Sequence, residues 1–213
     1  RIAYKEGYAE RCHFANFTLP QKTERTPRAL NREDFEKIRD VEIPAWRTTH
    51  ILVRDLFLFA CYTGTAYADA VSVTRDNLYT DDEGCLWLKY RRQKNELRAS
   101  VKLLPEALAL IEKYHDENRP TLFPMIYHPN LRRHMKSLAV LAGVSSTLCY
   151  HQARHSFASL ITLEAGVPIE TISRMLGHSD ITTTQVYARV TPKKLFEDMD
   201  RYIEATKDLK LIL

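Results

Sequence analysis

The chain lacks any long hydrophobic run. In its 213 residues no apolar stretch approaches the roughly 18 residues that suggest a membrane-spanning helix, and no signal peptide is visible. Its cysteines are few and scattered without CxxC spacing, at positions 12, 61, 85 and 149. We therefore expect no membrane insertion, and we expect reduced thiols in the cytoplasm rather than a disulfide framework.

The chain also has little excess charge. Its formal net charge is +4, which alone does not identify a nucleic-acid-binding protein. The distribution says more, because residues 89–102 hold six basic side chains against one acid, and Arg132, Arg133, His134 and Lys136 form a second basic cluster. Either cluster alone fits a solvated face. Two clusters beside a phosphate-handling motif favour contact with a phosphate backbone.

Thr26-Pro27 marks a boundary between two segments of the chain. Asn31, four residues later, is typical of a helix N-cap, with Glu33 and Asp34 in the first turn. The chain begins with Arg1 rather than Met, so we expect a fragment of a longer protein. We interpret residues 1–27 as a linker and residues 28–213 as one domain with a C-terminal helix and tail.

Hydrophobic periodicity predicts a mainly α-helical chain with a small antiparallel β-sheet, an α+β fold. Residues 48–62 are apolar nearly all round, which favours a core helix. Residues 77–104 alternate with period two and contain turn residues at 81–84 and 95–96, which indicates strands. Further helices are expected at 105–117, 130–142, 151–165 and 168–176, from 182 through Tyr187, and at 192–207.

The densest group of reactive side chains lies near the C-terminus, where fewer than forty residues hold His151, Arg154, His178 and Tyr187. An arginine can bind two phosphate oxygens in a fork, and imidazoles can move protons. A phenol can be a nucleophile if a base or a positive field offsets its pKa of about 10. Together these residues indicate phosphoryl transfer on DNA through a covalent phosphotyrosine.

In order and spacing this group resembles the tyrosine recombinase (phage-type integrase) family. The matching residues are His151-x-x-Arg154, Leu176-Gly177-His178 and Tyr187, with weaker matches at Thr63-Gly64, at Asp69 and at a basic hairpin containing Lys94. The resemblance spans roughly residues 28 to 205 and extends, more loosely, to integrases of conjugative transposons. It implies the fold of a tyrosine recombinase catalytic domain. It also implies that residues 1–27 end an N-terminal DNA-binding domain that is mostly missing here.

The resemblance implies a role for each matched residue. Tyr187 would be the nucleophile that holds the 3′ phosphate, and Arg154 would clamp that phosphate in the transition state. His151 would serve as general base or hydrogen-bond donor, and His178 would donate to the same phosphate. Lys94 would be the general acid for the leaving 5′ oxygen, although a lysine in a basic turn can also be a backbone contact only. No cofactor is implied, because the phosphotyrosine conserves the bond energy.

One position departs from the family pattern. The family places an arginine two residues after the glycine of the Thr-Gly pair, and Ala66 stands there instead. We predict that Arg92 substitutes for it, because Arg92 lies two residues from Lys94 and would share its strand face, whereas Arg91 would face the other way. Weaker substitutes are Arg47 and Arg75.

Other functions stay open from the sequence alone. A type IB topoisomerase uses similar residues but reseals the same strand. A decayed integrase that only binds DNA would explain Ala66. A metallohydrolase could use His151 and His155, which are four residues apart, but Gln152 stands where a zinc helix has glutamate, and no third ligand is evident.

The resemblance also predicts partners and location. We expect double-stranded DNA, a homo-oligomer that is tetrameric in the synapse, and a bacterial, nucleoid-associated protein of the cytoplasm. Phe196, Met199, Tyr202 and Ile203 recur at helical spacing and form one apolar stripe. We expect that helix and the apolar tail 209–213 to dock on a neighbouring protomer; the alternative is that both fold back onto their own core.

Overall fold

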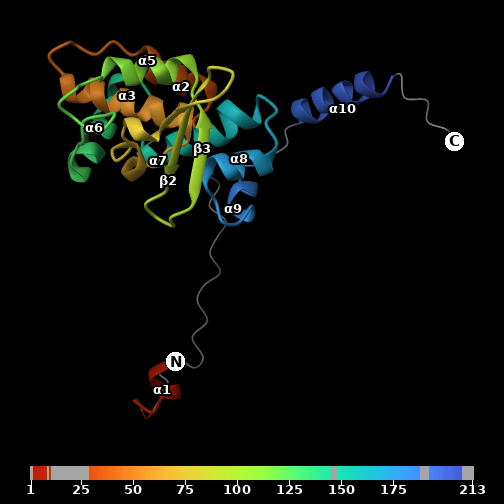
Figure 1. The fold of residues 1–213 in the computed structure, drawn as a ribbon, viewed down its shortest axis with the longest axis horizontal. Coiled ribbons are helices and arrows are strands. Elements are labelled where there is room, and N and C mark those ends of the chain that lie inside the picture. The colour runs from red at the N-terminus through yellow and green to blue at the C-terminus, as the bar shows by residue number, and fades with distance from the viewer. Residues whose placement is uncertain (1, 9, 11–28, 145–147, 188–191, 208–213) are drawn as a thin grey trace.

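The structure is a computed structural model that describes residues 2–8, 10, 29–144, 148–187 and 192–207. Helices dominate these residues, and a three-stranded antiparallel sheet in the order β1-β2-β3 lies against the helical body (Figure 1). The predicted mainly α fold with a small antiparallel sheet is therefore confirmed. None of the helices in the described ranges combines the length and the apolar character that crossing a bilayer demands.

The core forms around α3 (Thr48–Thr63), the helix predicted to be apolar all round. Ten of its residues are buried. Helices α5 (Pro105–Lys113), α6 (His128–Leu141) and α7 (Tyr150–Ser156) pack against it. The helix ends at Gly64, which has the left-handed φ of 70° that favours glycine. The C-terminal end of α3 is therefore fixed inside the body.

Shorter elements precede and follow α3. Helix α2 (Arg32–Asp40) begins at the predicted cap, where the Asn31 side-chain oxygen accepts a hydrogen bond from the backbone N–H of Asp34 at 2.7 Å. Phe35 and Ile38 bury one face of α2. The other short elements are α1 (Ile2–Lys5), α4 (Tyr67–Ala70) and the 3-10 turn η1 (Arg75–Asn77).

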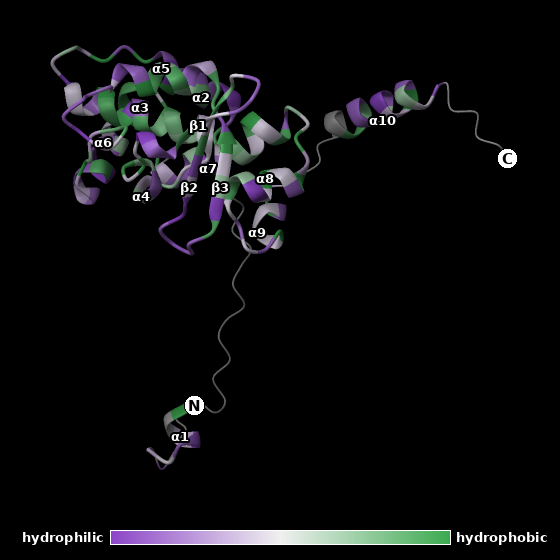
Figure 2. Ribbon diagram, viewed as in Figure 1, coloured by the Kyte–Doolittle hydropathy of each residue, from purple (hydrophilic) through white to green (hydrophobic). Residues whose placement is uncertain are grey.

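The sheet consists of β1 (Leu78–Thr80), β2 (Leu86–Arg91) and β3 (Arg98–Lys102). Leu88 pairs with Leu78 on one side and with Val101 on the other, and Leu88 and Val101 are buried. Lys89 and Arg91 face solvent, as the period-two pattern predicted. The hairpin that joins β2 to β3 is hydrophilic and extends beyond the helical body (Figure 2).

Helix α5 and the predicted helix 151–165 differ in length from the prediction. Helix α5 ends at Lys113 rather than near residue 117, because the Arg119 guanidinium donates to the carbonyl of Tyr114 and turns the chain. The predicted helix 151–165 is α-helical only as α7. It continues as a π-helical segment, η2 (Phe157–Leu163), in which the Thr162 hydroxyl donates to the carbonyl of Phe157 five residues back.

The C-terminal elements are α8 (Ile169–Leu176), α9 (Thr182–Gln185) and α10 (Pro192–Thr206). The prediction that Tyr187 lies on a helix is wrong, because α9 stops two residues earlier in a tight turn from the Tyr187 N–H to the Thr184 carbonyl. Helix α10 lies apart from the body (Figure 1). Its large apolar side chains are between 47% and 69% exposed, namely Leu195, Phe196, Met199, Tyr202 and Ile203.

Candidate active site

Arg154 lies at the centre of the site and is buried although it is charged, with only 2% of its surface exposed. Its Nη1 donates to the Gly64 carbonyl at 2.6 Å, where α3 ends. Its Nη2 donates to the Leu176 carbonyl at 2.5 Å, where α8 ends, and to His178 Nε2 at 2.9 Å. The guanidinium is therefore held rigidly between two helix ends.

Both helix ends require glycine. Gly64 and Gly177 have φ values of 70° and 59°, in the left-handed region. A Cβ on Gly64 would lie 2.6 Å from Phe157 and 2.7 Å from Leu176. A Cβ on Gly177 would lie 2.8 Å from Cδ of Arg92. The glycines of the Thr-Gly and Leu-Gly-His motifs thus let the side chains of Phe157, Leu176 and Arg92 pack directly against the backbone.

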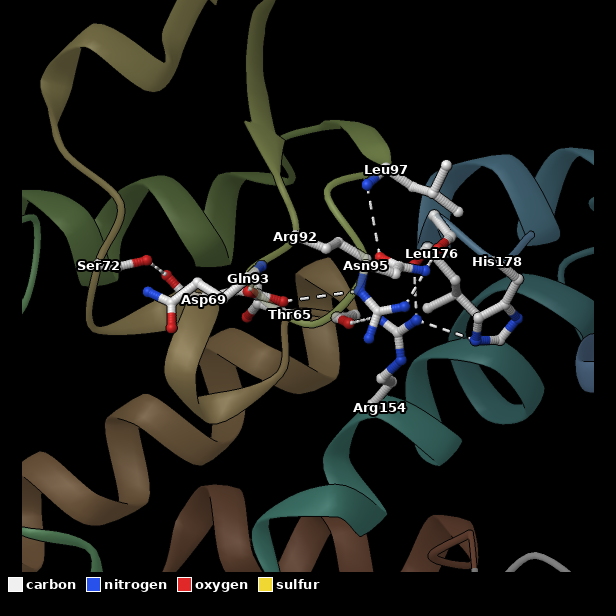
Figure 3. A network of polar contacts seen from close by, with 12 residues as sticks. Thr65, Asp69, Ser72, Arg92, Gln93, Asn95, Leu97, Arg154, Leu176 and His178 are labelled. Atoms are coloured by element: carbon white, nitrogen blue, oxygen red, sulfur yellow. Dashed lines mark hydrogen bonds and ion pairs between the residues drawn. The ribbon is translucent and has the colours of Figure 1, made fainter. Parts of the chain in front are cut away.

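Arg92 enters the same site from the hairpin. It is buried, and its Nη1 donates to the Gly177 carbonyl at 3.1 Å. Its Nε lies 3.7 Å from Asp69 Oδ2, while Asp69 Oδ1 accepts from the Gln93 backbone N–H at 2.9 Å. Figure 3 shows the guanidinium groups of Arg92 and Arg154 next to one another. Asp69 therefore positions the hairpin that brings in Arg92.

The two guanidinium groups create a strongly positive interior. Burial and the charge of Arg92 lower the pKa of Arg154 to about 10, which still leaves it protonated at neutral pH. Burial raises the pKa of Tyr90 to about 12, against the opposing effect of the Arg154 charge. Among the described residues, the buried side-chain polar atoms without a hydrogen-bond partner are Tyr90 Oη and Arg92 Nε. Such a site suits an anion with several acceptor oxygens.

His178 has a defined protonation state. Arginine can only donate, so the contact with Arg154 makes His178 Nε2 an acceptor. Its Nδ1 therefore carries the proton and donates to the Thr184 hydroxyl at 2.8 Å. Burial and the charges of Arg154 and Arg92 lower the pKa of His178 to about 4, in agreement with a neutral ring. In this state His178 orients Arg154, and it would have to release Arg154 before it could donate to a phosphate.

Tyr187 lies half-buried at the edge of this site. Its hydroxyl is 2.8 Å from Nδ1 of His155. Burial raises the pKa of Tyr187, and the positive charges of Arg154 and Arg92 oppose that rise. His151 is exposed one turn earlier on α7, and its ring centroid lies 4.3 Å from that of His155. The structure therefore places His155, rather than His151, in direct contact with the phenol.

Lys94 lies in the turn of the hairpin and is exposed. Desolvation lowers the pKa of His151, and the charges of Arg154 and Lys94 add to the effect, which puts Lys94 near the site. The prediction that Lys94 and Arg92 share a strand face is wrong. Arg92 is buried and continues the alternation of the buried Leu88 and Tyr90, whereas Lys94 lies in the turn of the hairpin, where strand alternation no longer holds, and is exposed.

Sequence reasoning missed three residues of this arrangement. His155 was considered only as a zinc ligand, although its position directly after Arg154 could have raised it as a neighbour of the phenol. Thr184 fixes His178, and the Asn95 side-chain amide donates to the Gly177 carbonyl at 3.3 Å. Neither had a signal in the sequence, because both contacts depend on how the hairpin and the turn after α9 are folded.

The metallohydrolase alternative receives no support from the described residues. Gln152, in the position of the zinc-helix glutamate, instead accepts a hydrogen bond from the Cys149 backbone N–H at 2.7 Å and caps α7. The contact on His155 Nδ1 is the Tyr187 phenol rather than a carboxylate or a thiol. Within the described ranges, the one group of three side chains that could hold a metal lies elsewhere, at Asp81, Glu83 and Cys85.

With this geometry in view, the comparisons with known proteins decide the family. The model of the phage integrase family matches residues 29–194, which is most of the chain. The chain belongs to the phage integrase family. Members similar to it include the tyrosine recombinases XerD of Listeria monocytogenes serotype 4b (strain F2365), 28% identical over 194 residues, and of Chlorobaculum tepidum, 27% identical over 193 residues. The matches cover 83% and 82% of this chain, but only 62% and 61% of those relatives.

Solved structures of the phage integrase family share the fold. A lambda integrase dimer bound to a COC′ core site matches with a TM-score of 0.69 at 18% identity, covering 91% of this chain and 70% of that one. The XerA recombinase matches with a TM-score of 0.63 at 20% identity, covering 84% of this chain and 66% of that one. At such identities the likeness concerns the fold, and the chemistry must be argued from the site itself.

Proposed function

We propose that this chain is the catalytic domain of a site-specific DNA recombinase that cuts and rejoins strands through a 3′-phosphotyrosine. The observation that carries the proposal is the Tyr187 phenol in the electrostatic reach of two buried guanidinium groups, Arg154 and Arg92. Membership of the phage integrase family supports it. Residues 28–213 form the catalytic domain, and residues 1–27 lead from a preceding DNA-binding domain.

The geometry supports a role for each group. A phosphodiester would enter beside Arg154 and Arg92, whose N–H groups stabilise the charge that develops on its oxygens. The Tyr187 oxygen would attack phosphorus, and the bond to the 5′ oxygen would break. Lys94 would protonate that leaving oxygen, while His151, exposed beside Arg154, would hydrogen-bond the phosphate. A 5′ hydroxyl from a second duplex would then reverse the step, so no cofactor is consumed.

The chain would act on double-stranded DNA as a homo-oligomer, with a tetramer in the synapse. The exposed apolar stripe of α10 supports docking on a neighbouring protomer, because a helix that exposes several large apolar side chains needs a partner surface. The tail 209–213 lies outside the described residues. We place the protein in the bacterial cytoplasm, associated with the nucleoid.

Covalent capture tests this function. A randomised pool of duplexes, each nicked so that the cut end diffuses away, is incubated with the protein, and bound DNA is recovered after denaturation. We expect a covalent adduct that Tyr187→Phe abolishes. DNA retained only before denaturation would instead identify a decayed integrase that binds without cutting, the alternative that Ala66 raised. Relaxation of a supercoiled plasmid without paired sites would identify a topoisomerase-like activity.

A further inference from the structure

His155 is placed to act on the nucleophile itself. It lies on α7 directly after Arg154 and is half-buried. Its Nδ1 is 2.8 Å from the Tyr187 hydroxyl, a hydrogen-bond distance, and the two ring planes are tilted by 52°. A general base must lie within such reach of the proton that it removes. Within the described part of the chain, this imidazole meets that geometric test.

His151 occupies a different position. It lies one helical turn before His155, exposed, and its ring meets that of His155 edge to face. The charges of Arg154 and Lys94 both act on its ring. This position suits a contact with the phosphate. It leaves His155 between His151 and the phenol.

The protonation state of His155 suits a proton acceptor. Burial, followed by the charges of His151 and Arg154, lowers the pKa of His155 to about 4. The ring is therefore neutral at pH 7, and one nitrogen has a free lone pair. An imidazole with so low a pKa is a weak base in the empty site. A bound phosphodiester would add negative charge beside the same cations and so raise the pKa of His155 towards neutrality.

We propose that His155, rather than His151, takes the phenolic proton of Tyr187 during cleavage. This inference rests on the proposed recombinase function. As the Tyr187 oxygen bonds to phosphorus, its proton passes to His155 Nδ1, and the 5′ oxygen leaves with a proton from a separate acid. In the rejoining step a 5′ hydroxyl bonds to phosphorus and gives its proton back to the conjugate base of that acid, while the phosphotyrosine bond breaks and His155 returns its proton to the departing phenolate. Protons and bonds therefore balance over one cycle.

A first experiment needs no DNA. Tyr187 is replaced by 3-fluorotyrosine, and the fluorine resonance is followed by NMR as the pH is lowered. The titratable and charged groups near His155 are His151, Arg154 and His178, and Tyr187 is its hydrogen-bond partner. We expect a titration step near pH 4 that His155→Asn removes and His151→Asn only shifts. An unchanged step in His155→Asn would overturn the contact between His155 and Tyr187, and His178→Asn, the control for the other imidazole that titrates near pH 4, should leave the step in place.

A second experiment measures single-turnover cleavage of a nicked duplex recovered by covalent capture. The side-chain amide of His155→Asn can still hydrogen-bond the phenol near the position of Nδ1, but it cannot accept a proton. We expect the cleavage rate to fall by about 10²-fold or more, as for loss of a general base. Because 3-fluorotyrosine has a more acidic phenol, it should recover part of the rate in His155→Asn and not in His151→Asn.

The outcomes separate the two proposals. Rescue of His151→Asn by 3-fluorotyrosine, without rescue of His155→Asn, would make His151 the base and overturn the inference, as would a wild-type rate for His155→Asn. Absence of any covalent adduct with the unmodified chain would overturn the recombinase function and this role with it. The NMR titration would in that case still report whether His155 contacts Tyr187.

Discussion

Arg92 should behave as the second catalytic arginine, because Ala66 cannot. In Arg92→Ala the site loses one of its two guanidinium groups. A charge-assisted contact to the transition state contributes about 3 to 4 kcal/mol, so cleavage should slow by about 10² to 10³-fold. The positive charge of Arg92 also lowers the pKa of both Tyr187 and His178, so both pKa values should rise in the variant.

The same substitution should leave the protein folded. It removes the hydrogen bond to the Gly177 carbonyl and the 3.7 Å contact with the Asp69 carboxylate, but it also removes a positive charge buried beside Arg154, and these effects oppose each other. Asp69 keeps its hydrogen bond from the Gln93 backbone. We therefore expect the free energy of unfolding to change by no more than about 1 to 2 kcal/mol, measured by urea denaturation.

The assay is single-turnover covalent trapping on the nicked duplex, and Arg91→Ala is the matched control. Arg91 is the last residue of β2 and faces solvent, so its loss should weaken DNA binding slightly and leave the cleavage rate of bound DNA unchanged. Ala66→Arg in the Arg92→Ala background tests whether an arginine at the family position restores cleavage. A cleavage rate of Arg92→Ala equal to that of the wild type would refute the idea that Arg92 replaces the arginine missing at position 66.

Four further predictions concern Tyr187, Arg154, the pair His155 and His178, and the C-terminal tail. Tyr187→Phe should remove cleavage and keep DNA binding in gel shifts, since phosphate contacts supply most of the affinity; adduct formation by this variant would refute the assignment of the nucleophile. Arg154→Ala should lower the cleavage rate by about 10² to 10³-fold and binding far less, and equal losses would make Arg154 an ordinary phosphate contact. The pKa of His155 and of His178 falls from 6.5 to about 4 in the folded state. Between pH 6.5 and pH 4 the unfolded chain binds more protons than the folded chain, so the contribution of these two neutral histidines to the free energy of unfolding is fully present above pH 6.5 and is lost as the pH falls. We expect the free energy of unfolding to decrease by roughly 1 to 2 kcal/mol towards pH 4, after allowance for solvent screening. A midpoint of thermal denaturation that does not change over that range would contradict this. Deleting the chain from Thr206 onward should weaken assembly on paired sites and spare single-site binding, and unchanged higher-order complexes in gel shifts would exclude exchange of C-terminal tails.

The sequence predicted the parts of the fold that depend on neighbouring residues alone. The apolar α3, the alternating strands and the Asn31 cap each follow from their own neighbours, and the structure has all three. Three- and four-residue spacing does not predict the π-helical segment after α7, whose backbone hydrogen bonds span five residues, as from the Glu164 N–H to the Ser159 carbonyl. The early end of α9 likewise depends on a turn that no periodic signal marks.

The sequence predicted which residues belong to the site better than it predicted how they are arranged. The motif identified Arg154, His178 and Tyr187, and the structure brings all three together. Strand alternation was right in placing Arg92 inward and Arg91 outward, and it failed for Lys94, which lies in the turn of the hairpin. The contact between His155 and Tyr187 joins segments 32 residues apart and could not be read from spacing along one helix.

The way in which backbone carbonyls hold both arginines has an electrostatic consequence. Gly64, Leu176 and Gly177 lie at the C-terminal ends of α3 and α8, where the aligned peptide dipoles of a helix concentrate partial negative charge. These helix ends offset part of the cost of burying the guanidinium groups without placing a full carboxylate against Arg154. A full counter-ion there would compete with an incoming phosphodiester, whereas a fixed dipole does not have to be displaced. The two guanidinium groups are thus kept charged and available for the phosphodiester that we propose binds there.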